Sequence, residues 1–264
     1  MNYITSQDGG DGFGSQLLSR ISGIAYANYH DLTYDNFPIR TIILEDNPST
    51  SRNNELDNVN LLLENIMKNL RIKSINEIDP SEKIDIYDRL SFYHEINLNL
   101  NQYFTIDFLG KLKNSYNLRP PDYYSNEKLN IAIHVRRGND IRSDDFSRYV
   151  TSDIYVNIIE RILKKYDNAI IHIFSWNDPE LKIESDRIEY HITYDGGKEF
   201  LSDFNALVHA DILLIGSSTF SLSAGFFNKN MVLYNKDIHR MQSINPFVPD
   251  WENNFHTIIG NLDQ

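Results

Sequence analysis

Two adjacent arginines, Arg136 and Arg137, follow a short apolar run in the segment "IAIHVRRGNDIRSDD", residues 131–145. A guanidinium stays charged and presents a planar fork of donors that matches two oxygens of a phosphate group. The chemistry that such a pair predicts is therefore the binding of a phosphate or diphosphate. The alternative is an ion pair with a surface acid, since exposed ion pairs are common and weak.

Hydroxyl side chains form a second candidate, because Ser217, Ser218 and Thr219 lie in "IGSSTFSLSAG", residues 215–225, between an apolar run and a helical pattern. Side-chain donors, the free N–H groups of a helix start and the helix dipole all favour an anion there. Ordinary N-capping explains the same residues equally well. If both motifs bind the same diphosphate, they hold it from two sides, and the pairing is more informative than either motif alone.

Glycines form a third candidate. Gly12 and Gly14 lie in the segment "DGGDGFGSQLL", residues 8–18, just before the first helical pattern. Glycine permits close approach of the backbone to a ligand, and a plain tight turn is the alternative. The third glycine of a dinucleotide-binding fingerprint is missing and no lysine follows, so the segment is not a P-loop. We expect Gly12 and Gly14 to contribute to substrate binding and do not expect ATP or GTP hydrolysis.

Other catalytic motifs fail at single positions. His94 and Glu95 open a zincin-like motif, but Leu98 stands where the second histidine belongs, and a serine-hydrolase elbow fails at Phe220, where glycine is required. Three further histidines have no metal-ligand spacing along the chain and are expected to be structural or surface residues: His172, His191 and His209. The sequence therefore predicts no metal site.

The elements that must position these residues are clearest after residue 128, where short apolar runs alternate with helical segments. This rhythm is typical of a parallel sheet covered on both faces. The predicted strands are residues 129–135, 169–175, 188–192, 211–216 and 231–235, and the predicted helices are residues 153–166, 198–209 and 220–228. In such Rossmann-type domains ligands bind beyond the carboxyl ends of the strands, which is where the arginine and serine motifs fall.

The preceding half of the chain has a mainly helical pattern. Its predicted strands are a short one near residues 3–4 and another at residues 41–45, and its predicted helices are residues 15–30, 56–70 and 84–116. Two prolines in "LRPPDYYSNEK", residues 118–128, interrupt any helix. We therefore predict an N-terminal domain of residues 1–125 and a C-terminal Rossmann-type domain of residues 126–264.

The composition sets limits on function. The 264 residues are 41% hydrophobic and carry a net charge of −12, which indicates a globular chain and disfavours binding to nucleic acid or anionic membranes. The absence of cysteine excludes disulfides and thiolate catalysis and fits a reducing compartment. With no signal-like start and no apolar run of membrane-spanning length, we expect a cytoplasmic protein.

Four segments, taken together, resemble the superfamily of α1,2-, α1,6- and protein O-fucosyltransferases. These enzymes share an "HxRR" motif at a strand end, and here "HVRR" stands at residues 134–137. The segment "ALVHADILLIGSSTFS", residues 206–221, is similar to their downstream helix, strand and hydroxyl-rich loop. The "FSWNDPEL" at residues 174–181 resembles a region of the α1,6 branch, and "GFGSQL" at residues 12–17 resembles the glycine-rich N-terminal turn. The segments occur in the expected order across most of the chain.

The resemblance implies a GT-B-like α/β fold, with two Rossmann-type lobes of which the N-terminal one is minimal and largely helical. It implies inverting transfer of fucose from GDP-fucose to a glycan hydroxyl without a metal or other cofactor. In this family pattern Arg136 binds the β-phosphate with the assistance of Arg137, and His134 positions the nucleotide. Asp203 accepts hydrogen bonds from guanine, and Ser218 and Thr219 hold phosphate or sugar.

The general base is expected to be a carboxylate, and Asp144 and Asp145 lie near the offset where the α1,6 branch carries an acidic residue. Their alternative is a pair of solvated loop acids. The motif also departs from the family, since Asn139 takes the usual acidic position and Asp140 comes one residue late. Transfer of a different nucleotide sugar and a catalytically inactive nucleotide-sugar-binding protein therefore remain alternatives.

Overall fold

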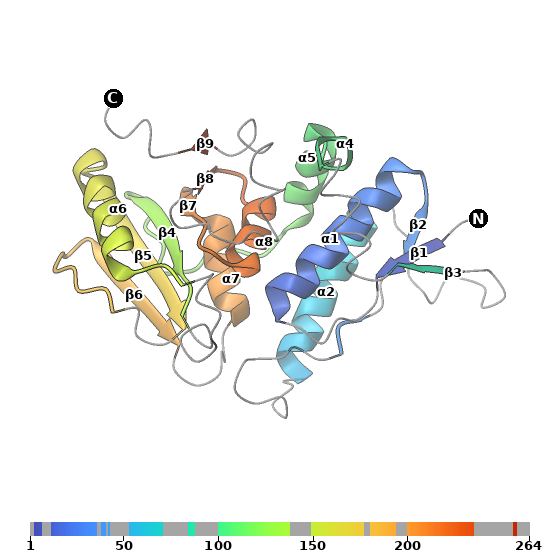
Figure 1. The fold of residues 1–264 in the computed structure, drawn as a ribbon, viewed down its shortest axis with the longest axis horizontal. Helices are drawn as coiled ribbons and strands as arrows, with labels where there is room; N and C mark the ends of the chain where they lie inside the picture. Colours follow the sequence, from blue (N-terminus) through green and yellow to red (C-terminus); the bar gives the residue numbers. More distant parts are fainter. Residues whose placement is uncertain are drawn as a thin grey trace. The chain divides into compact units, whose positions relative to one another are not determined.

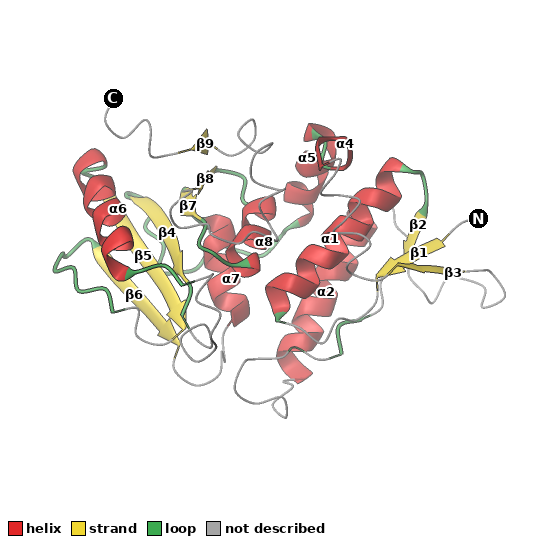
Figure 2. Ribbon diagram, in the orientation of Figure 1, coloured by secondary structure: helices red, strands yellow, loops and turns green. Residues whose placement is uncertain are grey.

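The computed structural model describes residues 3–6, 12–35, 38–40, 42, 53–70, 84–87, 100–137, 149–176, 180–193, 200–234 and 256–257. The chain divides into two compact units, Met1–Asn117 and Leu118–Gln264, a few residues before the boundary suggested by the two prolines. Both units combine helices with an all-parallel sheet (Figures 1 and 2), so the predicted α/β class is confirmed.

Unit 1 is built on a parallel sheet with the strand order β2-β1-β3. Its elements are β1 (Tyr3–Ser6), α1 (Phe13–Tyr29), β2 (Thr33–Asp35), α2 (Asn53–Asn69), β3 (Ile84–Tyr87), α4 (Leu100–Tyr103) and α5 (Ile106–Ser115). The apolar stripe predicted for the first helix is confirmed, because Leu17, Ile21 and Ile24 are fully buried. The helix predicted from residue 84 is wrong at its start: "IDIY" alternates apolar and polar residues and pairs as β3 along β1.

Two further features of unit 1 bear on the predictions. Strand β2, with the sequence "TYD", was not predicted, since three residues are too few to show a period. The strand predicted at residues 41–45 lies almost entirely outside the described residues.

Unit 2 is a doubly wound sheet with the strand order β6-β5-β4-β7-β8-β9. Its elements are β4 (Leu129–Val135), α6 (Ser152–Lys165), β5 (Ala169–Trp176), β6 (Ile188–Thr193), α7 (Phe200–His209), β7 (Ile212–Leu214), α8 (Thr219–Phe227), β8 (Met231–Tyr234) and β9 (His256–Thr257). The chain enters at β4, proceeds outward through β5 to β6, and returns to the other side of β4 as β7. This is the strand order of a Rossmann fold, and it creates a topological switch point between β4 and β7. The five strands and three helices predicted for this half are confirmed.

The layers of unit 2 follow from alternation along β4. The side chains of Ile131, Ile133 and Val135 pack with buried isoleucines of α6, including Ile158 and Ile162. The even-numbered side chains of β4 therefore face the opposite layer, where α7 and α8 lie (Figure 1). This division decides which layer each residue of the arginine motif faces.

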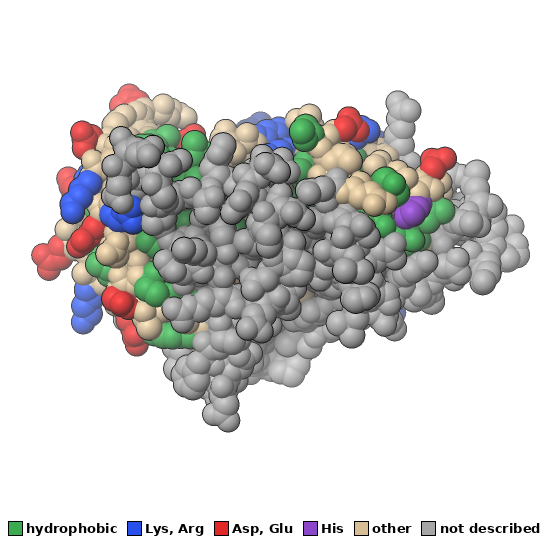
Figure 3. Space-filling model, turned by 45° about the horizontal axis from the view of Figure 1, so that its top comes forward, with side chains coloured by type: hydrophobic (Ala, Val, Ile, Leu, Met, Phe, Trp, Pro, Cys, Tyr) green, Lys and Arg blue, Asp and Glu red, His purple; other side chains and the backbone are tan. Residues whose placement is uncertain are grey.

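The surface of unit 2 around α6 carries acidic and basic side chains that intermingle, at the left of Figure 3. Among the described helices, none combines the length and the apolar character needed to cross a membrane.

Candidate functional site at the switch point of unit 2

The predicted phosphate-binding motifs meet at the switch point of the sheet. β4 ends at Val135 and is followed by Arg136 and Arg137, while β7 ends at Leu214 and is followed by the serine-rich loop. The two strands are hydrogen-bonded neighbours with Ile133 opposite Leu214. Because parallel strands end at the same edge, both motifs lie at the carboxyl edge, where ligands of such sheets bind.

A glycine lets the two motifs approach each other closely. A Cβ atom built on Gly216 would overlap the backbone carbonyl oxygen of His134 and would lie 3.4 Å from its Nδ1 atom. No residue with a side chain fits there unless the backbone moves. Gly216 therefore brings the loop after β7 against the end of β4.

His134 occupies the centre of this edge. Its ring lies 5.4 Å from that of Phe220 in α8. Its Nδ1 atom is buried and has no hydrogen-bond partner among the described residues. Burial lowers the pKa of His134 to about 3, with a smaller contribution from the nearby charge of Arg136, so the ring is neutral at neutral pH. A neutral, incompletely satisfied imidazole at the switch point is suited to orient a polar ligand.

Arg137 is held within the protein. Its guanidinium donates hydrogen bonds to the carbonyl oxygens of Arg136 (2.9 Å) and Val150 (3.1 Å) and to Oγ of Ser152 (3.1 Å). It also lies 4.8 Å from the centre of the Tyr149 ring, and only 3% of the residue is exposed. Arg137 continues the odd-numbered side chains of β4 and so joins the strand end to the start of α6. This placement favours a structural role over the predicted contact with phosphate.

Arg136 follows the even-numbered side chains of β4, on the side of His134. Arg136 is partly exposed at the carboxyl end of the strand. Its positive charge contributes to the lowered pKa of His134. The two adjacent arginines thus differ in burial: Arg137 is buried, whereas Arg136 is partly exposed. Arg136 is the one whose position fits a contact with a bound anion.

The hydroxyl-rich loop has two kinds of serine. Ser218 is the N-cap of α8, since its Oγ accepts a hydrogen bond of 3.2 Å from the backbone N–H of Phe220. Ser221 stabilises the loop, because its Oγ accepts a 3.0 Å hydrogen bond from the backbone N–H of Gly216. Ser217 is fully buried, and its Oγ has no hydrogen-bond partner among the described residues. Capping therefore explains Ser218, while Ser217 and the partly exposed Thr219 retain the predicted role as anion donors.

Asp203 lies in the first turn of α7. A helix that connects parallel strands starts at the carboxyl edge, so Asp203 is expected at the same edge as Arg136 and the serine loop. The neighbouring side chain supports this placement, because the ring of Phe204 lies 5.5 Å from that of Phe220. His134, Phe220 and Phe204 therefore form a continuous aromatic contact that links β4, α8 and α7.

The remaining predicted residues belong to unit 1 or to a segment outside the described residues. Gly12 is the N-cap of α1 in unit 1, with a φ of −61° that any residue adopts, and Gly14 is buried within that helix. Asp144 and Asp145, the candidates for the general base, lie outside the described residues. The structure therefore brings together the C-terminal members of the predicted site, in unit 2.

A buried acid in unit 1 was missed by sequence reasoning. Asp35 ends β2 with no exposed surface, and neither of its carboxylate oxygens has a hydrogen-bond partner among the described residues. Burial raises the pKa of Asp35 to about 6. Its backbone carbonyl accepts a 2.6 Å hydrogen bond from the hydroxyl of Thr5 in β1. A single Asp after a three-residue strand gives no recognisable signal in the sequence.

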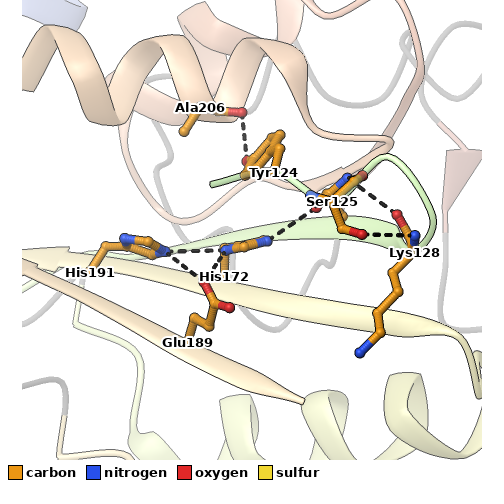
Figure 4. A network of polar contacts seen from close by, with 8 residues as sticks. Tyr124, Ser125, Lys128, His172, Glu189, His191 and Ala206 are labelled. Carbon is orange, nitrogen blue, oxygen red and sulfur yellow. Dashed lines mark hydrogen bonds and ion pairs between the residues drawn. The ribbon is translucent and has the colours of Figure 1, made fainter. Parts of the chain in front are cut away.

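A cluster of ionisable side chains on β5 and β6 was also missed. His172, Glu189 and His191 come from neighbouring strands and point toward one another (Figure 4). Their distances along the chain match no metal-binding motif. Only the pairing register of β5 with β6 reveals that they meet.

A surface hollow lies at the opposite edge of unit 2, where β4 and β5 begin. Its lining includes Lys128, Asn130, Lys165, Asn168 and Asp211. None of the residues predicted to bind the donor lines it. Ligands of doubly wound sheets bind at the carboxyl edge, which is the edge opposite this hollow.

Comparisons with known proteins found no family model that matches the chain. One curated protein with a similar sequence is the ribosomal RNA small subunit methyltransferase C of Buchnera aphidicola subsp. Cinara cedri. It is 26% identical over 187 residues, which cover 66% of this chain and 50% of that protein. The chain thus spans about half the length of this relative.

Among solved structures, the chain is similar to a mutant of FUT1 from Arabidopsis thaliana in complex with GDP, with a TM-score of 0.46 and 13% identity over 88% of this chain and 69% of that one. It is also similar to the α-1,6-fucosyltransferase NodZ soaked with GDP-fucose, with a TM-score of 0.38 and 11% identity over 86% of this chain and 92% of that one. A third similar structure is WaaG, a glycosyltransferase of lipopolysaccharide biosynthesis, with a TM-score of 0.26 and 10% identity over 93% of this chain and 84% of that one. At these TM-scores, the functional assignment depends on the chain's own residues.

Proposed function

We propose that this chain is an inverting glycosyltransferase of the GT-B type that transfers fucose from GDP-fucose to a hydroxyl group of a glycan. The observation that carries the proposal is the meeting of the arginine-bearing end of β4 with the start of α8 at the switch point, with Gly216 against His134. The order of the four sequence segments that resemble fucosyltransferases supports the same activity.

The switch point supplies the interactions that departure of a nucleoside diphosphate needs. As the bond to the sugar breaks, negative charge grows on the β-phosphate. Arg136, the hydroxyl of Ser217 and the N-terminal end of the α8 dipole would stabilise that charge. Donors fixed before the reaction stabilise the transition state without reorganisation, so this step needs no metal ion.

His134 and Asp203 fit roles in binding the nucleotide. The imidazole of His134 is neutral at neutral pH, so it can orient the nucleotide through hydrogen bonds without adding a charge. A carboxylate is an acceptor-only group, and the adjacent N–H donors of a guanine edge match the two oxygens of Asp203. This pairing would favour GDP-sugars over donors with other bases.

Inversion requires the acceptor hydroxyl to attack from the face opposite the leaving diphosphate while a base removes its proton. We propose a carboxylate for this role and retain Asp144 and Asp145 as the candidates. The acceptor is proposed only as a class, a glycan that offers a free hydroxyl. We also propose a cytoplasmic location, since a chain without cysteine suits a reducing compartment.

A panel of ligands tests the donor assignment. Calorimetric titration would compare GDP-fucose, GDP-mannose, UDP-glucose, GDP alone and S-adenosylmethionine, the last because one similar protein is a methyltransferase. We expect GDP-fucose and GDP to bind and S-adenosylmethionine not to bind. Binding of S-adenosylmethionine alone would overturn the proposal, and preference for another nucleotide sugar would change the donor while keeping the reaction class.

A turnover assay separates an enzyme from an inactive binding protein. Release of GDP from GDP-fucose would be followed with and without a glycan array as the acceptor source. We expect release to accelerate with a subset of the glycans. Binding of GDP-fucose without any release under single-turnover conditions would instead identify a nucleotide-sugar-binding protein.

A further inference from the structure

The cluster on β5 and β6 brings three potential metal ligands to one point. His172 lies opposite Glu189 in the register of the two parallel strands, and His191 follows two residues after Glu189 on the same face. The Nδ1 atom of His172 lies 3.2 Å from Nε2 of His191 and 3.4 Å from Oε2 of Glu189. The Nε2 atom of His191 lies 4.0 Å from the same carboxylate oxygen.

The two separations that involve His172 are close to those within a metal coordination shell, and the third is about 0.5 Å longer. A tetrahedral Zn²⁺ ion that binds nitrogen and oxygen at 2.0–2.2 Å keeps its ligand atoms about 3.3–3.5 Å apart. We propose that His172, Glu189 and His191 form a binding site for a divalent transition metal ion, with Zn²⁺ as the expected occupant. Two imidazoles and one carboxylate are a ligand set that zinc uses with a further position open to water or substrate.

Asn130 fixes the tautomer that the proposed site requires. The Nδ2 atom of Asn130 lies 2.8 Å from the carbonyl oxygen of Ser125 and 3.2 Å from Oδ2 of Asp211, two groups that can only accept. The Oδ1 atom must then be the acceptor, and it faces Nε2 of His172 at 3.4 Å. His172 therefore carries its proton on Nε2, and the lone pair on Nδ1 points into the cluster.

With this tautomer, His172 offers the cluster an acceptor and directs no N–H toward Glu189. The Nδ1 lone pair of His172 and the carboxylate oxygen of Glu189 are two acceptors only 3.4 Å apart. The single N–H that His191 can direct inward reaches His172 but lies 4.0 Å from Glu189. A metal ion would contact all three atoms at once. The other ring nitrogen of His172 donates a hydrogen bond to Oδ1 of Asn130, and metal-binding histidines usually have a hydrogen-bond partner of this kind.

The rings of the cluster are held rigidly. The ring of His191 stacks on Phe174 at 4.6 Å and on Tyr123 at 4.8 Å, so aromatic rings cover both of its faces. The ring of Tyr124 lies 4.7 Å from that of His172, and the Tyr124 hydroxyl donates a 2.8 Å hydrogen bond to the carbonyl of Ala206 in α7. Aromatic packing of this kind fixes the direction of the ligand atoms.

Access from solvent also suits a metal site. The side chains of Glu189 and His191 are 45% and 23% exposed, which leaves a path from solvent.

The proposed metal site is separate from the proposed donor site. His134, Phe174 and His191 are register partners across β4, β5 and β6, so His191 lies two strand spacings, about 10 Å, from His134. The metal-independent role proposed for Arg136 does not involve this cluster. Binding of metal can therefore be measured whether or not the chain is a transferase.

Metal binding by the untagged full-length chain, stripped with a chelator, provides the test. We expect about one Zn²⁺ per chain by calorimetry, a rise in melting temperature of about 5 °C at a hundredfold excess over Kd, and visible d–d absorption when Co²⁺ is added. Glu189→Gln and His191→Gln are expected to weaken Co²⁺ binding at least about 100-fold, since even outer-shell changes cost up to that much.

A matched variant controls for other histidines. His209→Gln alters a residue of the same type at the end of α7, where its Nδ1 contacts the carbonyl oxygen of Asn205, and it should bind Co²⁺ like the unaltered chain. The proposal is overturned if the unaltered chain gives no Co²⁺ spectrum and no Zn²⁺ heat. It is equally overturned if folded Glu189→Gln and His191→Gln variants, checked by circular dichroism, retain full affinity.

Discussion

The carboxyl edge of β4 and β7 and the histidine cluster of β5 and β6 lie in the same sheet but are built in different ways. At the edge, the chemistry comes from short contiguous segments that follow strands, and these segments lie at the same edge because their strands are neighbours. In the cluster, the chemistry comes from single residues within strands, and His172 meets Glu189 only through register. A site made of loops can be recognised in a sequence, whereas a site made across strands requires the pairing of the strands.

The largest effect is expected from Arg136→Ala. Loss of a donor to the leaving diphosphate should lower turnover of GDP-fucose at least about 100-fold, equivalent to about 3 kcal/mol, with the melting temperature little changed. Steady-state kinetics and thermal denaturation would measure both quantities. Arg119→Ala, which alters an exposed arginine before β4, is the control and should keep normal turnover. Unchanged turnover in Arg136→Ala would remove the main reason to place the diphosphate at this edge.

Arg137→Ala should mainly lower stability, whereas Arg136→Ala should mainly lower turnover. The substitution removes the hydrogen bonds to Val150 and Ser152 together with the contact on Tyr149. We expect the free energy of unfolding to fall by about 2–3 kcal/mol, because buried acceptors lose a charged donor. Chemical denaturation would measure the loss. If Arg137→Ala were fully stable and inactive, the role of Arg137 would be to bind the substrate and not to stabilise the start of α6.

The pH dependence of stability offers a third comparison, centred on His134. The folded-state pKa of about 3 lies below the ordinary value of 6.5, so unfolding takes up a proton between these values. Stability is thus fully present above pH 6.5 and declines as the pH falls, by about 1.4 kcal/mol per pH unit for one proton. Between pH 6.5 and pH 5, His134→Gln should lose about 2 kcal/mol less than the unaltered chain in urea denaturation. Equal losses in both would mean that the ring is solvated in the folded state.

A pair of glycines provides the last comparison, and Gly110→Ala has the smallest expected effect of all. Gly216→Ala should destabilise the chain by about 1–3 kcal/mol and weaken GDP binding, because the new methyl group overlaps the carbonyl of His134. Gly110→Ala in α5 adds the same methyl group where nothing lies within 4 Å and should raise stability by about 0.5–1 kcal/mol. Thermal denaturation and GDP titration of both variants would measure these changes. A harmless Gly216→Ala would mean that the two motifs are not in close contact.

Much of unit 2 could be predicted because its central strands, such as β4 and β5, are nearly continuous apolar runs that are buried on both faces. Residues 129–135 form β4 as predicted, since this strand lies at the centre of the sheet. Unit 1 was harder to predict because its strands have only three or four residues, so "IDIY" at residues 84–87 was taken for the start of a helix. Short strands carry too few residues to distinguish a period of two from one of 3.6.

The site was predictable in part for a related reason. The pairing of HVRR with GSST follows from the rule that ligands bind at strand ends, and the structure brings these motifs together. The difference between Arg136 and Arg137 was not predictable, because it depends on which layer each side chain faces. Ser218 could have been either a cap or a ligand from sequence alone, and its hydrogen bond to Phe220 identifies a cap.

One amide in unit 2 joins several parts of the fold. Asn130 connects the turn at Ser125, the carbonyl of Lys128, the carboxylate of Asp211 before β7 and the ring of His172. An engineer who wished to graft the histidine cluster onto another parallel sheet would have to transplant this amide as well. Without it, the imidazole would be free to flip, and the grafted cluster would contain the same three side chains with no preferred direction.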